Sequence, residues 1–133
     1  MNILITLPGY LIDAIIEGKK TFELRSSKPK LMNLKEDGFF CVERGTDKVR
    51  CWCRCDRIVQ VSTSYNSFTG WDTLLAVPMD YIERYTKHKK EVFMWHIKEV
   101  VKFEDGELIR DSLMVDRNPQ QFAYCPLSHG RSY

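Results

Sequence analysis

Two long runs of strand-forming residues constrain the fold of this chain most strongly. The first covers residues 49–61, and the second begins at Val92 and continues to Phe103. Both are rich in β-branched and aromatic side chains, which favour strands, and the first is long enough to bend around a barrel. Few helical patterns separate the strands, whereas a βαβ fold would require many. The sequence therefore predicts an α+β fold with a curved or barrel-like sheet.

Shorter patterns supply the remaining elements. Apolar residues recur at helical spacing from Tyr10 onward, and Gly18 is suited to end that helix. Residues 108–115 are ambiguous between helix and strand. The other predicted elements are strands at residues 3–5, 21–25 and 39–42 with a last short strand ending near residue 125, and helices at residues 71–77 and 79–86.

Length and charge bound the organisation and the partners. A chain of 133 residues predicts one domain, which we place at residues 1–125, followed by a polar tail at residues 126–133. The net charge is only +2, from 20 basic and 18 acidic residues. This balance excludes nucleic-acid binding by bulk electrostatic attraction, so such a partner would have to be held by local clusters of basic residues.

The cysteines point to a reducing compartment. There are five of them, an odd number, and the N-terminus lacks the features of a secretion signal. No segment approaches the run of about 20 apolar residues that a membrane span needs. We therefore expect a cytoplasmic location and no membrane partner. Cys51, Cys53 and Cys55 alternate along one strand without a second ligand pair at zinc-site spacing, so we expect them to be core residues and predict no metal site.

The chain that follows Gly18 carries most of the candidate chemistry. It presents Lys19, Lys20, Thr21, Glu23 and Arg25, and the last three share one face of the predicted strand because side chains alternate with a period of two. A face with a hydroxyl, a carboxylate and a guanidinium is suited to bind a planar polar group or a phosphate. The alternative is a solvated strand face on which Glu23 and Arg25 form a surface ion pair.

Four segments of the chain, in order, resemble the ASCH family of the PUA-like superfamily. They are residues 15–25, 48–58, 95–103 and 118–125, and the last is similar to a closing motif of phage and prophage members. The resemblance implies a five- to six-stranded pseudo-barrel, with a first helix that flanks a cleft and one or two small helices. It also implies RNA or modified nucleosides as partners. We expect no cofactor.

The resemblance, together with the residue chemistry, gives a predicted ligand-binding set. Lys20, Thr21, Glu23 and Arg25 would form one wall of the cleft, and Gln120 with an aromatic side chain would form the other. Tyr10 would line the same cleft, and Trp71, which follows a polar loop, offers a surface on which an unpaired base could stack.

Two other functions stay open at this point. Some family members are amidohydrolases that deacylate acetylated cytidine with a Lys, a Thr and a more distant Glu. The Lys matches Lys20, but Glu23 stands at the Thr position and the distant Glu has no match better than Glu83. If the chain is a hydrolase, Lys20 and Glu23 are its predicted catalytic residues, although a neighbouring Glu23 would keep Lys20 charged and so favours binding. The third hypothesis is a phage-type protein-interaction or inhibitor module.

Overall fold

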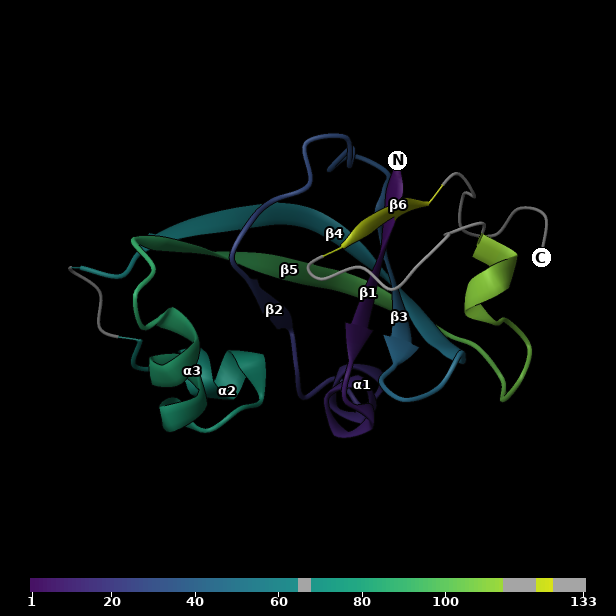
Figure 1. The fold of residues 1–133 in the computed structure, drawn as a ribbon, viewed down its shortest axis with the longest axis horizontal. Coiled ribbons are helices and arrows are strands. Elements are labelled where there is room, and N and C mark those ends of the chain that lie inside the picture. Colours follow the sequence, from purple (N-terminus) through teal and green to yellow (C-terminus); the bar gives the residue numbers. More distant parts are fainter. Residues whose placement is uncertain (65–67, 114–121, 126–133) are drawn as a thin grey trace.

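A single mixed sheet organises the chain (Figure 1). The computed structural model describes residues 1–64, 68–113 and 122–125, and in these residues six strands lie in the order β2-β5-β4-β3-β1-β6. β1 and β3 pair in parallel, and the other neighbouring strands are antiparallel. The strands are β1 (Asn2–Leu7), β2 (Phe22–Arg25), β3 (Gly38–Glu43), β4 (Val49–Ser62), β5 (Glu91–Lys102) and β6 (Ala123–Cys125). The predicted α+β class is confirmed.

The two long strands curve the sheet, as the length of the first run predicted. β4 has 14 residues and β5 has 12, and their pairing shifts register near Cys55, which bends the strands. Although β2 and β1 are far apart in the strand order, the Arg25 guanidinium in β2 lies 3.5 Å from the Thr6 carbonyl in β1. The Trp95 ring of β5 likewise meets the Phe122 ring next to β6, at 6.2 Å between centroids. The sheet therefore partly closes on itself as a pseudo-barrel.

In the described part of the chain, three short α-helices accompany the sheet. They are α1 (Gly9–Ile16), α2 (Trp71–Leu75) and α3 (Met79–Thr86), and the ambiguous region contains a 3-10 helix, η1 (Arg110–Leu113). Figure 1 shows α2 beside α3, with α1 at the ends of β1 and β3. Within the described residues, no helix has the length and apolar character needed to span a membrane.

Buried side chains form one core on each face of the sheet. Because neighbouring residues of a strand point to opposite faces, Phe39 belongs to the core that α1 covers and Phe40 to the core that η1 covers. All five cysteines are buried and carry free thiols, which confirms that the cysteines of β4 are core residues.

Candidate functional site

A tight turn at the end of α1 directs Lys20 into the protein. Gly18 has a φ of +79°, a conformation that glycine adopts without strain. The Gly18 amide donates to the Ile15 carbonyl at 3.1 Å, and the Lys20 amide donates to the Ala14 carbonyl at 3.0 Å. The chain therefore reverses immediately after the helix, and Lys20 is only 2% exposed.

Lys20, Glu23 and Arg25 form a buried charged cluster, which we call the β2 triad. One Glu23 carboxylate oxygen lies 3.1 Å from the Lys20 ammonium, and the other accepts a hydrogen bond from Arg25 Nε at 2.7 Å. The Glu23 side chain is 5% exposed and that of Arg25 10%. The alternative of a solvated ion pair between Glu23 and Arg25 is therefore wrong, because the sheet closes around the strand that carries them.

The same segment anchors the C-terminal end of α2. The Lys20 ammonium donates to the Leu75 carbonyl at 3.0 Å, and the Thr21 amide donates to the Leu74 carbonyl at 2.9 Å. These carbonyls belong to the last turn of a helix, where they have no partner within the helix itself. The predicted residue Thr21 thus contributes a backbone contact here, and it is not among the residues that line the cavity described below.

The two cations of the β2 triad hold Glu23 in its charged form. Burial alone would raise the pKa of Glu23, but the charges and hydrogen bonds of Lys20 and Arg25 outweigh burial and lower it below its ordinary value of 4.5. A carboxyl group whose pKa is lower in the folded protein than in the unfolded chain stabilises the native state at pH values above its pKa in the unfolded chain. That stabilisation is lost as the pH falls through the folded pKa.

We therefore expect the contribution of Glu23 to the free energy of unfolding to depend on pH in the acidic range. The wild-type protein should have a constant advantage in free energy of unfolding over a Glu23→Gln variant at pH values above about 5.5, since Glu23 is then ionised in both states. The advantage should shrink as the pH falls below 4.5. Urea denaturation of both proteins at a series of pH values measures this difference, and an advantage that grows on acidification would contradict the assignment.

A cavity of about 650 Å³ opens beside the β2 triad. Glu23 and Arg25 line it, and Pro8, just before α1, also contributes. The other lining residues come from β1, β2, the turn after β3, α3 and η1, and they are Thr6, Leu7, Leu24, Arg44, Gly45, Thr46, Asp47, Tyr81, Tyr85 and Arg110. The predicted cleft is thus beside the start of α1, while α3 supplies its aromatic wall.

Two tyrosines from one face of α3 form that wall. Tyr81 and Tyr85 are four residues apart, and their rings are stacked with centroids 6.4 Å apart and planes 10° apart. Burial raises the pKa of Tyr81, and the nearby Glu23 carboxylate raises it further. The Lys89 ammonium lies 4.7 Å from the centre of the Tyr85 ring, so the basic run at residues 87–90 adjoins the cavity.

Of the remaining predicted site residues, Tyr10 and Trp71 do not line this cavity. Tyr10 is 61% exposed and is not among the lining residues. Trp71 packs edge-on against Phe22, with ring centroids 5.0 Å apart. Because Phe22 and Glu23 are adjacent in β2, their side chains lie on opposite faces of the strand. Gln120 lies outside the described residues.

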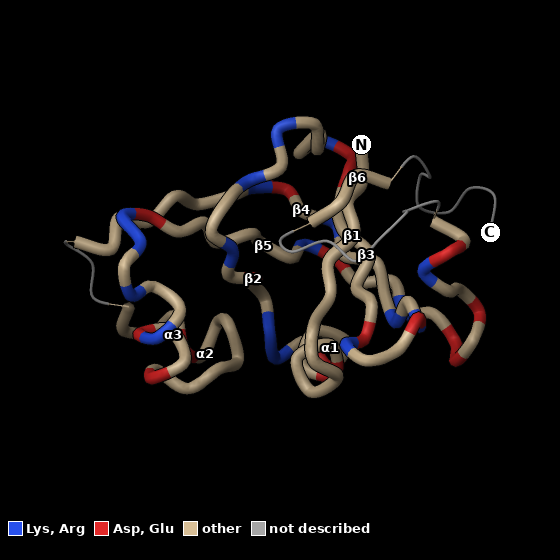
Figure 2. The backbone as a smooth tube through the Cα atoms, viewed as in Figure 1, with Lys and Arg blue, Asp and Glu red and all other residues tan. Residues whose placement is uncertain are grey.

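Among the cavity residues that sequence reasoning missed are two arginines and two tyrosines. Arg44 carried no functional signal, Arg110 fell in the ambiguous region at residues 108–115, and Tyr81 and Tyr85 looked like the apolar stripe of a helix. Their spacing on α3 was the only available signal, and it indicates one helix face without indicating what that face meets. Figure 2 shows lysines and arginines spread along the described backbone among acidic residues. The positions of the charged residues along the chain would therefore not have located the cavity.

Comparisons with known proteins agree with this architecture. The ASCH domain family model matches residues 9–107. Crystal structures of ASCH from Zymomonas mobilis superpose on the chain, although no curated protein matches it. A serine-to-alanine mutant of that protein has a TM-score of 0.77 and 18% identity, and covers 92% of this chain and 87% of its own.

For a crystal structure of ASCH from Zymomonas mobilis, the TM-score is 0.74 at 16% identity, with 92% of this chain and 86% of that one covered. Identities this low establish a shared fold only. The family model, however, spans most of the chain and includes the β2 triad. The chain belongs to the ASCH domain family.

Proposed function

We propose that this protein binds single-stranded RNA or a modified nucleoside in the cavity beside the β2 triad. One observation carries the proposal: three arginines, a stacked tyrosine pair and a buried carboxylate all line a single cavity of about 650 Å³. Arginine guanidinium groups match the geometry of phosphate oxygens, and tyrosine rings stack on unpaired bases. A carboxylate accepts hydrogen bonds from the amino and hydroxyl groups of a nucleoside.

The size of the cavity favours a ligand of one or two nucleotide units. Sites for small molecules usually enclose about 300–1,000 Å³, and this cavity lies within that range. A base inside a duplex could not reach the tyrosine rings without leaving its stack. We therefore infer that the ligand is a free nucleoside or an unpaired nucleotide of a single strand.

The β2 triad would hold the polar wall of this site in place. Arg25 is fixed by Glu23 at 2.7 Å, and Glu23 is fixed in turn by Lys20 at 3.1 Å. A ligand that meets side chains already in position loses less conformational entropy on binding. Each Glu23 oxygen retains a second lone pair that can accept from a ligand.

Binding should depend on Arg44, which is exposed at the mouth of the cavity. We expect Arg44→Ala to weaken the binding of a fluorescein-labelled single-stranded RNA oligonucleotide several-fold at low salt. It should also reduce the slope of log Kd against log salt by about 0.7, the value for one lost phosphate contact. Fluorescence anisotropy across a salt series measures both quantities.

Arg84 provides the matched control. It is an exposed arginine on α3 that pairs with Asp80 at 2.7 Å and does not line the cavity. Arg84→Ala should leave the affinity and the salt slope close to those of the wild type. Equal losses in both variants, or no binding by the wild type at low salt, would refute the cavity as an RNA site.

The amidohydrolase hypothesis has less support from the contacts of Lys20. Its ammonium is a donor to both the Leu75 carbonyl and Glu23, and Lys20 is not a lining residue of the cavity. A general base needs a free lone pair aimed at its substrate. Turnover of acetylated cytidine that a Lys20→Ala variant loses would reverse this ranking.

A cytoplasmic location, a likeness to phage and prophage members, and a role as a protein-interaction or inhibitor module stay predictions. The first half of the segment that suggested the phage likeness, residues 118–121 of 118–125, lies outside the described residues. Pull-down from a bacterial lysate with and without nuclease distinguishes a protein partner from one held through RNA.

A further inference from the structure

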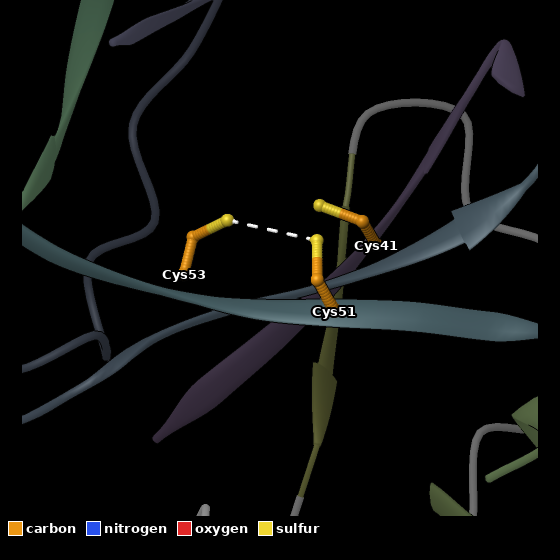
Figure 3. Close-up of side chains that lie close together, drawn as sticks. All are labelled: Cys41, Cys51 and Cys53. Atoms are coloured by element: carbon orange, nitrogen blue, oxygen red, sulfur yellow. Dashed lines mark hydrogen bonds between the residues drawn. The ribbon is translucent and has the colours of Figure 1, made fainter. Parts of the chain in front are cut away.

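Three cysteine thiols from adjacent strands meet in the core (Figure 3). Cys41 lies in β3 directly opposite Cys51 in β4, and Cys53 shares a face of β4 with Cys51. The three sulfur atoms all lie within 4.8 Å of one another, and those of Cys51 and Cys53 are 3.9 Å apart. Figure 3 shows the three side chains converging on one point.

This spacing matches the coordination of a metal ion. Three sulfur atoms bound at about 2.3 Å to one ion are about 4 Å apart in a trigonal arrangement. The observed separations already approach that distance without a rotation of the strands. Small changes of the three side-chain torsions would therefore bring all three sulfurs to one ion.

We propose that Cys41, Cys51 and Cys53 form a buried three-thiol site for a soft monovalent metal ion, Cu(I). Soft thiolate ligands select Cu(I), Zn(II) and iron–sulfur clusters. Structural zinc is almost always four-coordinate, and among the described His, Cys, Asp and Glu residues no fourth ligand atom joins this group. Cu(I) accepts three sulfur ligands, and the three thiols release their protons to the solvent as they bind it as thiolates.

The surroundings of the three thiols fit this assignment. Each of the three cysteines is 0% exposed, so water is excluded as a fourth ligand and bound Cu(I) would be shielded from oxidants. The β3–β4 pairing shifts register immediately after Cys41. Such an irregularity interrupts the hydrogen-bond ladder, and it offers a place where the two strands can open to admit an ion.

The test is anaerobic loading of the reduced full-length chain with Cu(I) supplied as its acetonitrile complex. One sample is loaded in the native state and a second during refolding from urea, so that slow entry into the core is covered. We expect one copper per chain after gel filtration, and a higher thermal midpoint for the loaded protein because the folded state, which holds the three thiols together, binds the ion more tightly than the unfolded chain does. Zn(II) at the same concentration should be lost on the column.

Variants decide which thiols hold the ion. Cys41→Ala, Cys51→Ala and Cys53→Ala should each lower the affinity at least tenfold in competition with a chromogenic Cu(I) chelator. Cys55→Ala is the matched control, since Cys55 is equally buried in the same strand but lies outside the three-thiol group. Circular dichroism identifies any variant that fails to fold, and the wild-type stoichiometry and thermal shift test the site without variants. Absence of bound copper, retention of Zn(II) as tight as that of Cu(I), or an equal loss in Cys55→Ala would overturn the proposal.

Discussion

Replacing Glu23 by Gln should lower the free energy of unfolding by about 3–5 kcal/mol, because the substitution leaves two buried cations without a carboxylate. Lys20 and Arg25 are 2% and 8% exposed and lie on either side of Glu23. Water cannot replace the lost charge at these exposures. A loss of this size is a large share of the 5–15 kcal/mol that holds a typical domain folded. Urea denaturation followed by circular dichroism measures it.

An exposed ion pair supplies the control for this experiment. Lys19 and Glu17 lie 3.3 Å apart with side chains 72% and 53% exposed. Glu17→Gln should therefore change the free energy of unfolding by less than about 0.5 kcal/mol. Replacing the whole β2 triad with Lys20→Met, Glu23→Leu and Arg25→Met should recover most of the stability lost in Glu23→Gln, since no uncompensated charge then remains. A Glu23→Gln protein as stable as the Glu17→Gln control would refute the structural role of the triad.

The triad also connects stability to the proposed function. A buried ion pair is seldom the most stable way to fill a core, because apolar residues of similar volume often do as well. Here the triad fixes α2 through the Leu75 carbonyl and, at its other end, presents Arg25 to the cavity. The triple variant should therefore fold and yet bind RNA poorly, a combination that apolar packing alone would not produce.

Local sequence patterns were sufficient to predict most of the fold. The helix expected at residues 79–86 is α3, and the long strand expected at residues 49–61 is β4 with one further residue. These elements are set by side-chain periodicity over a few turns or residues, which the sequence displays directly. The β2 triad could likewise be predicted as a group. Glu23 and Arg25 are two residues apart and share one face of the strand, and Gly18 ends the helix just before Lys20.

The remaining features depend on contacts between distant parts of the chain. Cys41 joins Cys51 only through the register of β3 with β4, and a shift of one residue would turn its thiol to the other face. The cavity needs Arg44, Tyr81 and Arg110 to meet across three separate segments. Trp71 was expected at the ligand, but its ring packs on Phe22 because the short α2 docks against β2.

Of the two arginines and two tyrosines in the cavity that the sequence did not reveal, Tyr85 should have the largest effect on binding. We expect Tyr85→Ala to raise the Kd for single-stranded RNA roughly tenfold, because stacking of a base on an aromatic ring contributes about 1–3 kcal/mol. Tyr85→Phe should retain most of the affinity, since the ring provides the stacking surface. Fluorescence anisotropy with the same labelled oligonucleotide measures both variants, and circular dichroism confirms that each is folded.

Tyr10 is the matched control, because it is a tyrosine that is 61% exposed and lies outside the cavity. Tyr10→Ala should leave the Kd within about twofold of the wild type, as expected for an exposed residue without contact to the ligand. The comparison also decides between two positions for the ligand. A large loss in Tyr10→Ala with none in Tyr85→Ala would place the base against α1, as the family resemblance implied, and would remove the α3 tyrosine pair from the site.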